Sequence, residues 1–166
     1  MALIRLSVEL KDQPIIRTSD GKIIAKAKDV LIDPQTVTIS ALLFEEGGLF
    51  NRKTKLVPAN AVQVWGEDVI LVSGPDEVIT KDQLPCHERC LSVASQIKGR
   101  TVVGTDGTRI GEVNDVVVNS EGQIVGYDLS KVFVQGPVAE SKRIAVDATH
   151  ALGPDVLVVD QAKLPQ

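Results

Sequence analysis

The chain has 166 residues, of which 43% are hydrophobic and 24% charged, a balance typical of a globular protein rather than a disordered one. It carries 10 basic and 12 acidic residues before Pro85 and 8 and 10 after it, so neither half is basic enough to indicate a nucleic-acid-binding domain. No apolar run approaches the ~20 residues that cross a bilayer, and the start lacks the layout of a signal peptide. We therefore expect a soluble cytoplasmic protein without a membrane span.

An internal repeat organises the sequence. Residues 106–119 repeat the pattern of residues 20–33, which lie 86 positions earlier. Both segments begin with Asp-Gly, continue with isoleucine and a small residue, and end with an aspartate and three aliphatic residues. A second block, residues 57–72, matches residues 144–159 with a shift of 87. The repeat indicates one small unit duplicated in tandem.

Short predicted strands fill the first copy. Residues 28–32 are expected to form one strand, and Asp33-Pro34 ends it because proline fixes φ and favours a turn. Residues 37–44 alternate in polarity at first and then become continuously apolar, which is typical of a strand whose second part is covered on both faces. Gly47-Gly48 ends that strand.

The second copy repeats this arrangement. A turn at residues 119–122 joins its long strand to a returning strand over residues 123–129, so a hairpin is expected. The last hairpins turn at residues 65–68 and 152–155. Five or six short strands per copy, with no helix-length pattern between them, predict a small β-barrel whose closure removes most exposed edges.

The expected fold class is all-β, with two tandem barrels related by internal duplication. We place the first barrel at residues 1–77, a short helical or irregular linker at 78–90 and the second barrel at 91–166. Leu91-Ser92-Val93 repeats Leu6-Ser7-Val8, so each barrel is expected to have the same lead-in segment. Because the linker contains several aliphatic residues, we expect it to pack and to hold the two barrels rigidly together.

Two equivalent positions early in the long strand hold small residues, Ala25 and Gly111. Small residues there indicate a close backbone approach at a barrel corner or a bulge. The alternative is an exposed position that is indifferent to side-chain size.

The repeated pattern resembles the PRC-barrel family. The shared features are the Asp-Gly turn, the isoleucine followed by a small residue, the aspartate with three aliphatic residues, the Val/Ile-rich strand and the final Gly-x-Asp hairpin. This family is named after the cytoplasmic domain of the photosynthetic reaction-centre H subunit, and a related barrel forms one domain of a ribosome maturation factor. The resemblance covers roughly residues 5–75 and 90–162. It implies a barrel that docks on another macromolecule, with no catalytic residue set.

Cys86, His87 and Cys90 are the only concentrated ligand-type residues. In a helical segment Cys86 and Cys90 share a face and could bind a metal or form a redox pair. Structural zinc requires four ligands, however, and only the distant His150 could add another. We therefore favour small apolar or surface cysteines, and expect no metal and no cofactor.

Asp29 and Asp115 occupy matched positions. A pair of carboxylates could serve acid–base chemistry. Each barrel holds only one of them, so we do not expect them to converge. We interpret each as a buried aspartate that accepts backbone N–H bonds.

Four large apolar residues of the first copy, Phe44, Leu49, Phe50 and Trp65, have weaker counterparts in the second copy. Copies that differ in their large apolar residues are expected to have different roles. We therefore predict that these four residues form a partner-binding patch. The alternative for Phe50 is that it plugs the mouth of the barrel.

The predicted function is that of a non-enzymatic adaptor or assembly protein, which binds another protein or itself through its barrel surfaces. The alternative is a ribosome- or RNA-processing-associated factor, which could dock on a ribosomal protein without a basic face. A metal- or redox-responsive switch at the cysteine linker is a third possibility. An enzyme is not expected, because no nucleophile and base are arranged together.

Overall fold

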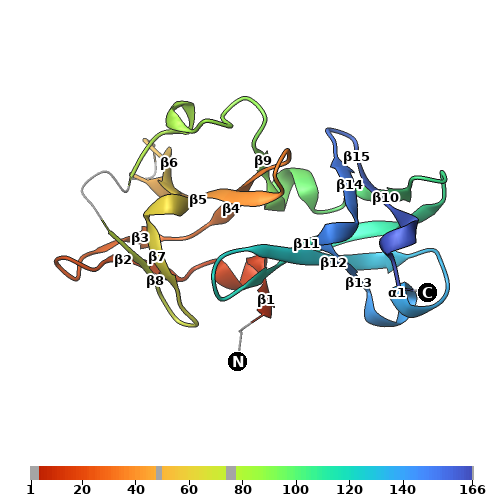
Figure 1. Cartoon of the computed structure of the whole chain (residues 1–166). Helices are drawn as coiled ribbons and strands as arrows, with labels where there is room; N and C mark the ends of the chain where they lie inside the picture. The colour runs from red at the N-terminus through yellow and green to blue at the C-terminus, as the bar shows by residue number, and fades with distance from the viewer. Residues whose placement is uncertain (1–3, 48–49, 74–77, 166) are drawn as a thin grey trace.

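A computed structural model gives the fold and describes residues 4–47, 50–73 and 78–165 (Figure 1). Strands dominate, and the described residues include one short α-helix, α1 (Pro137–Ser141), together with several single helical turns. None of the described helices is long and apolar enough to cross a membrane. The strands are β1 (Ile4–Leu6), β2 (Pro14–Arg17), β3 (Ile23–Lys26), β4 (Asp29–Asp33), β5 (Thr38–Glu46), β6 (Lys53–Pro58), β7 (Val62–Trp65), β8 (Ile70–Val72), β9 (Leu91–Ser92), β10 (Thr101–Gly104), β11 (Arg109–Asn119), β12 (Ile124–Val132), β13 (Arg143–Ala145), β14 (Thr149–Leu152) and β15 (Val156–Val159).

Both halves of the chain follow one topology. In the first half β2 lies antiparallel to β3 and parallel to β8, and in the second half β10 lies antiparallel to β11 and parallel to β15. The pairs β4–β5, β5–β6 and β7–β8 correspond in the same way to β11–β12, β12–β13 and β14–β15. The predicted duplication and the all-β class are confirmed.

The sheets of the two halves remain open. The first half contributes to two four-stranded sheets, ordered β3-β2-β8-β7 and β6-β5-β4-β9, whereas the second forms a seven-stranded sheet ordered β13-β12-β11-β10-β15-β14 with β1 added on β11. Strand pairing among the described residues thus does not close either half into the ring that we expected. In the first half Ala27 and Lys28 interrupt the long strand, so its two parts, β3 and β4, join different sheets.

The repeated Asp-Gly pair builds the same tight turn in each half. Gly21 and Gly107 have φ values of 69° and 86°, in the left-handed region that glycine adopts without steric cost. The preceding aspartates accept backbone N–H bonds two residues ahead, Asp20 at 3.1 Å and Asp106 at 2.8 Å. The turn chemistry predicts this geometry, because Asp side chains favour such local bonds.

The two lead-in strands cross between the halves. Strand β1 pairs antiparallel with β11, and Leu6 lies opposite Val117. Strand β9 pairs antiparallel with β4, and Leu91 lies opposite Ile32. Both copies have the same lead-in segment, as expected, but each segment completes the sheet of the other half, an exchange that the repeat does not predict.

A single hydrophobic cluster extends through both halves. Ile15 and Ile70 from the first half and Val102 and Leu157 from the second are fully buried in it. Burial of each such side chain stabilises the fold by about 1.5–3 kcal/mol. Tyr127 is also fully buried, its hydroxyl lies 2.6 Å from Thr149 Oγ1, and burial raises the pKa of the Tyr127 phenol. A continuous core supports the expected rigid apposition of the two units.

The connection between the halves packs against the first half. Ile79 exchanges two backbone hydrogen bonds of 2.8 Å with Leu56 of β6, and Leu84 is 4% exposed. In Figure 1 this green segment arches over β4–β6 before it enters β9. Its packing agrees with the prediction made from its aliphatic residues.

Gly111 marks a close approach between β11 and β12. A Cβ atom at this buried position would lie 2.2 Å from the backbone oxygen of Lys131, well inside van der Waals contact. Gly111 pairs with Val132 across the ladder, whereas β3, which carries the equivalent Ala25, does not pair with β5. The predicted close approach is confirmed for Gly111, and the alternative of an exposed, indifferent position is wrong.

Candidate functional site

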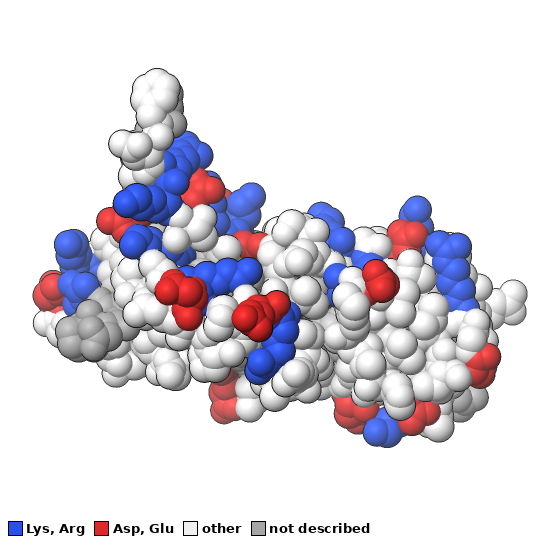
Figure 2. All heavy atoms as spheres, turned by 90° about the horizontal axis from the view of Figure 1, so that it is seen from above, with Lys and Arg blue, Asp and Glu red and all other residues white. Residues whose placement is uncertain are grey.

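The hairpin formed by β5 and β6 carries the most exposed large apolar side chain of the described chain. Its ladder runs from the Ala41–Pro58 pair to the Glu46–Lys53 pair, and Phe50 follows at the tip. The Phe50 side chain is 93% exposed. Figure 2 shows the hairpin as a finger that projects from the body and ends in uncharged atoms. Phe50 therefore does not plug a barrel interior.

Charged side chains lie along the lower part of this finger on the face that Figure 2 shows. Arg52 and Lys28 both pair with Glu45, at 3.2 and 3.7 Å respectively. Lys53 is exposed and Lys55 is half-buried. The finger thus carries Phe50 at its tip and several basic side chains below it, some of whose charge is neutralised by Glu45.

The other predicted patch residues lie elsewhere. Phe44 is 2% exposed and packs in the core at the base of the same hairpin, and Leu49 lies outside the described residues. Trp65 is 9% exposed, because its indole ring packs against Gly122 in the β11–β12 turn of the other half. The structure does not bring Phe44, Phe50 and Trp65 together into one surface. Their role in partner binding stays a prediction, and Phe50 is the one of these three whose side chain is accessible.

Trp65 belongs instead to the contact between the halves. Arg5 of β1 reaches the carbonyl oxygens of Trp65 and Glu67 at 3.5 and 3.4 Å. Arg5 is 7% exposed, and its burial lowers the pKa of the guanidinium. The backbone of Trp65 thus helps to hold β1, the exchanged lead-in strand, in place.

The equivalent connection in the second half folds back onto the body. Helix α1 begins with Pro137, whose missing N–H suits a first helical position, and Val138 in this helix is 3% exposed. Phe133 precedes it, is 48% exposed and lies under the Arg109 guanidinium, 4.4 Å from ring centroid to Cζ. The two copies therefore differ at this connection, which extends outward in the first half and is packed down in the second.

The cysteines of the linker form a disulfide bond. Cys86 and Cys90 are bonded, and both are buried beside Leu31, Leu56 and Leu84. Of the small apolar or surface cysteines that we favoured, their burial fits the apolar interpretation, whereas the bond between them fits the redox pair that we did not favour. No group of His, Cys, Asp and Glu side chains in the described residues is arranged to hold a metal ion.

An ion pair anchors the linker beside the disulfide. Arg89 donates two hydrogen bonds to Asp33 at the end of β4, Nε to Oδ1 at 3.0 Å and Nη2 to Oδ2 at 2.9 Å. The bidentate geometry favours the charged carboxylate, so the Asp33 pKa lies below its ordinary value. This pair and the disulfide together fix the chain just before β9.

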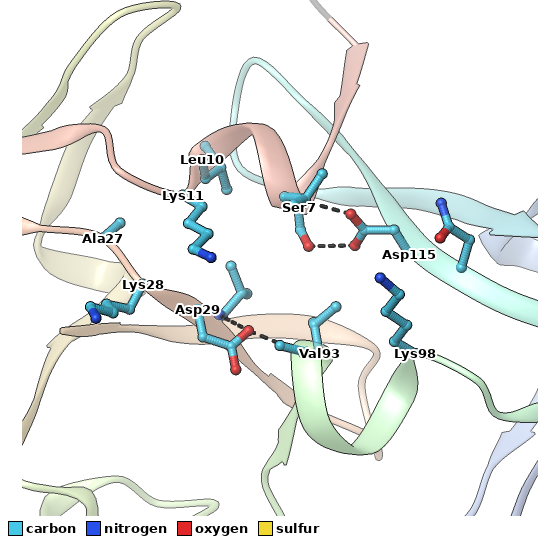
Figure 3. A pocket seen from close by; sticks show the side chains of 13 residues that line it. Ser7, Leu10, Lys11, Ala27, Lys28, Asp29, Val93, Lys98 and Asp115 are labelled. Carbon is cyan, nitrogen blue, oxygen red and sulfur yellow. Dashed lines mark hydrogen bonds between the residues drawn. The ribbon is translucent and has the colours of Figure 1, made fainter. Parts of the chain in front are cut away.

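Asp29 and Asp115 line one pocket between the halves, contrary to the expectation that they stay apart (Figure 3). The Asp115 carboxylate accepts bonds from the Ser7 hydroxyl and from the Val8 N–H at 2.9 Å. The Asp29 carboxylate accepts bonds from the Ser92 hydroxyl and from an N–H at 3.2 Å. Each aspartate thus fixes the lead-in segment that arrives from the other half.

The interpretation of these aspartates as buried acceptors of backbone N–H bonds is confirmed for Asp115, whereas Asp29 accepts such bonds but is only half-buried. Asp115 is 4% exposed, and both side chains also accept the N–H of the next residue at 2.7 Å. The repeated Leu-Ser-Val triplet is the sequence signal that could have indicated their partners. Carboxylates with several donors each are structural anchors here, and neither is placed as a free base.

A comparison with curated proteins gave no match. A comparison with protein-family models matched the PRC-barrel domain twice, at residues 5–79 and 93–164. The two matches correspond to the two copies of the topology described above. The chain therefore belongs to the PRC-barrel family and contains two tandem copies of its domain.

Proposed function

We propose that this protein is a non-enzymatic adaptor that captures a partner protein through the exposed tip of the β5–β6 hairpin. PRC-barrel domains are protein-interaction modules of a non-catalytic fold family. The observation that carries the proposal is the 93% exposure of Phe50 on a finger that stands away from the body. An aromatic residue gains little by being held in water, whereas aromatic anchors commonly dominate the energy of interfaces.

The charges of the finger define the partner further. Lys53 is exposed, and Arg52 is 60% exposed beside Glu45. An apolar pocket with an acidic rim is complementary to such a surface, because rim charges steer association and fix orientation. We therefore infer a partner that receives Phe50 in an apolar pocket and places acidic groups around it.

The divergence of the copies supports the same location. The second copy replaces the finger with α1 and buries Val138. The equivalent connection of the second copy carries Phe133, which is 48% exposed and lies against the Arg109 guanidinium, whereas Phe50 is 93% exposed. Residues that the copies share, by contrast, fill the common core.

A pull-down from native lysate with Phe50→Ala tests this proposal. Phe133→Ala is the matched control, because Phe133 lies in the equivalent connection and is 48% exposed. Loss of an interface anchor costs at least about 2 kcal/mol, or roughly 30-fold in affinity, so Phe50→Ala is expected to lose the partner that wild type and control retain.

Two further measurements distinguish protein capture from RNA-dependent capture and from self-association. Partner capture that is insensitive to RNase supports the proposal, whereas capture that depends on RNA favours the ribosome- or RNA-associated alternative. Light scattering shows whether the partner is a second copy of the chain. Equal capture by wild type, Phe50→Ala and Phe133→Ala places the docking surface elsewhere.

A further inference from the structure

A pocket of about 250 Å³ lies where the two lead-in segments cross between the halves (Figure 3). Leu10, Ala27, Val30 and Val93 give it an apolar lining, and these four residues also belong to the shared core. The pocket combines side chains from both copies, so neither copy forms it alone. Drug-sized ligands occupy pockets of about 300–1,000 Å³, which makes this one suitable for a smaller molecule.

The carboxylates in the pocket are already engaged. Asp29 and Asp115 each accept a serine hydroxyl and two backbone N–H groups. These bonds fix both carboxylates, and each carboxylate in turn holds the lead-in segment that comes from the other half. Asn114, which also lines the pocket, donates to Asp128, so the polar groups that remain to meet a ligand are the lysines, whose charges also offset those of the two carboxylates.

Two of these lysines occupy equivalent positions in the two copies. Lys11 follows the buried Leu10 and Lys98 follows the buried Ile97, 87 residues later. In Figure 3 the ammonium groups of Lys11 and Lys98 turn towards the space between the halves. Within the part of the chain that the structure describes, neither ammonium group has a hydrogen-bond or ion-pair partner. Lys28, the third lysine of the lining, pairs instead with Glu45 at 3.7 Å.

We propose that this pocket binds a small aliphatic carboxylate. The ligand's carboxylate lies between Lys11 and Lys98, and its hydrocarbon stem packs on Leu10 and Val93. An apolar lining with a few convergent polar groups is the general design of a ligand site, and two lysines that line the same pocket favour an anionic head group. The site is independent of the Phe50 finger, so its test does not depend on partner capture.

Hexanoate is the probe, with hexanol and hexylamine as controls of the same stem and different head-group charge. Titration of ¹⁵N-labelled full chain is followed through the amide signals of Val8 and Ala94, whose N–H groups donate to the pocket carboxylates. We expect saturable shifts with hexanoate, weaker ones with hexanol and none with hexylamine.

Lysine variants place the binding. Lys11 and Lys98 are both exposed, so Lys11→Gln and Lys98→Gln are each expected to weaken hexanoate binding only roughly threefold, and the double variant roughly tenfold, as exposed ion pairs do. Lys26→Gln, at an exposed lysine of β3 outside the pocket lining, is the control and should bind like wild type. The lysines carry no packing role in the core, so these variants are expected to fold.

Three results would overturn the proposal. Equal binding of hexylamine and hexanoate would show that the head-group charge is not selected. Unchanged affinity in the double lysine variant would place the carboxylate elsewhere. Absence of saturable shifts with all three probes would show that the pocket takes no such ligand.

Discussion

Replacement of Gly111 by alanine gives the most direct measure of how tightly the second half is packed. The added Cβ atom would lie 2.2 Å from the Lys131 backbone oxygen and 3.4 Å from the Val132 Cα atom. Gly111 has no positive φ, so the effect is one of space rather than of backbone conformation. Because the obstacle is backbone, no side-chain rotation relieves it.

The expected cost has two parts. Overpacking of a tight site costs about 1–3 kcal/mol, and separation of β11 from β12 weakens a ladder hydrogen bond worth about 1 kcal/mol. The sum is about 2–4 kcal/mol of the free energy of unfolding. For a chain of this size, each kcal/mol lowers the Tm by about 2–4 °C, so the Tm is expected to fall by roughly 4–16 °C.

Thermal unfolding followed by circular dichroism measures this change. Gly153→Ala is the matched control, because its Cβ atom would meet only the Val156 oxygen at 3.4 Å, an ordinary contact at its closest. We expect that variant to melt within a few degrees of wild type. Equal melting temperatures for Gly111→Ala and Gly153→Ala would refute the close approach of β11 and β12.

Three further predictions concern the contacts that join the halves. Asp115→Ala removes the acceptor of three hydrogen bonds and leaves their donors unsatisfied, so denaturant unfolding should show a loss of about 2–4 kcal/mol. Wild-type stability in this variant would mean that the exchanged segment is not anchored there. Replacement of Cys86 and Cys90 by serine should reduce stability by about 2 kcal/mol, the loop-closure entropy of so short a ring, and the unfolded wild type should contain no free thiol. Free thiols detected without reductant would contradict the disulfide. The Asp33 pKa is depressed by Arg89, so the pair stabilises the fold above the ordinary Asp pKa of about 3.9, and this stability is lost as pH falls through the lower folded-state value. Arg89→Gln should flatten the acid limb of the stability–pH curve, and an unchanged limb would exclude the pair as its cause.

Much of the fold could be predicted from the sequence, because the repeated residues are those that particular backbone conformations and close strand contacts require. The Asp-Gly pairs predicted two identical turns, and the small residue at Gly111 predicted a close strand approach. These features are local, or involve strands close in sequence, so that pattern and spacing suffice to infer them.

The exchange of the lead-in strands could not be inferred in the same way. Leu6-Ser7-Val8 and Leu91-Ser92-Val93 are the same triplet, so either one satisfies the pairing requirements of either half. What decides the pairing is the path of the linker, which the Ile79 bridge and the Arg89 ion pair hold against the first half. A repeat specifies which segments can pair and leaves open to which copy they belong.

The candidate site shows a similar division. The sequence singled out Phe50 because the copies diverge there, but an apolar residue after a glycine pair fits an exposed tip and a buried plug equally well. Trp65 is likewise a large aromatic residue beside a glycine in the sequence. In the structure it is buried, because its indole ring packs against Gly122 of the other half. Contacts between residues far apart in the sequence decide which of these aromatic side chains is exposed and which is buried. Such contacts depend on how the two halves are placed relative to each other.

Site-specific photo-crosslinking tests the central functional claim most directly. A photoreactive phenylalanine analogue is placed at Phe50 in one variant and at Phe133 in another, and the full chain is irradiated in its native lysate. We expect a discrete protein adduct from position 50 that persists after RNase treatment and is absent from position 133. The same adduct from both positions, or a protein adduct from position 133 alone, would contradict the claim that the first-half finger is the docking surface.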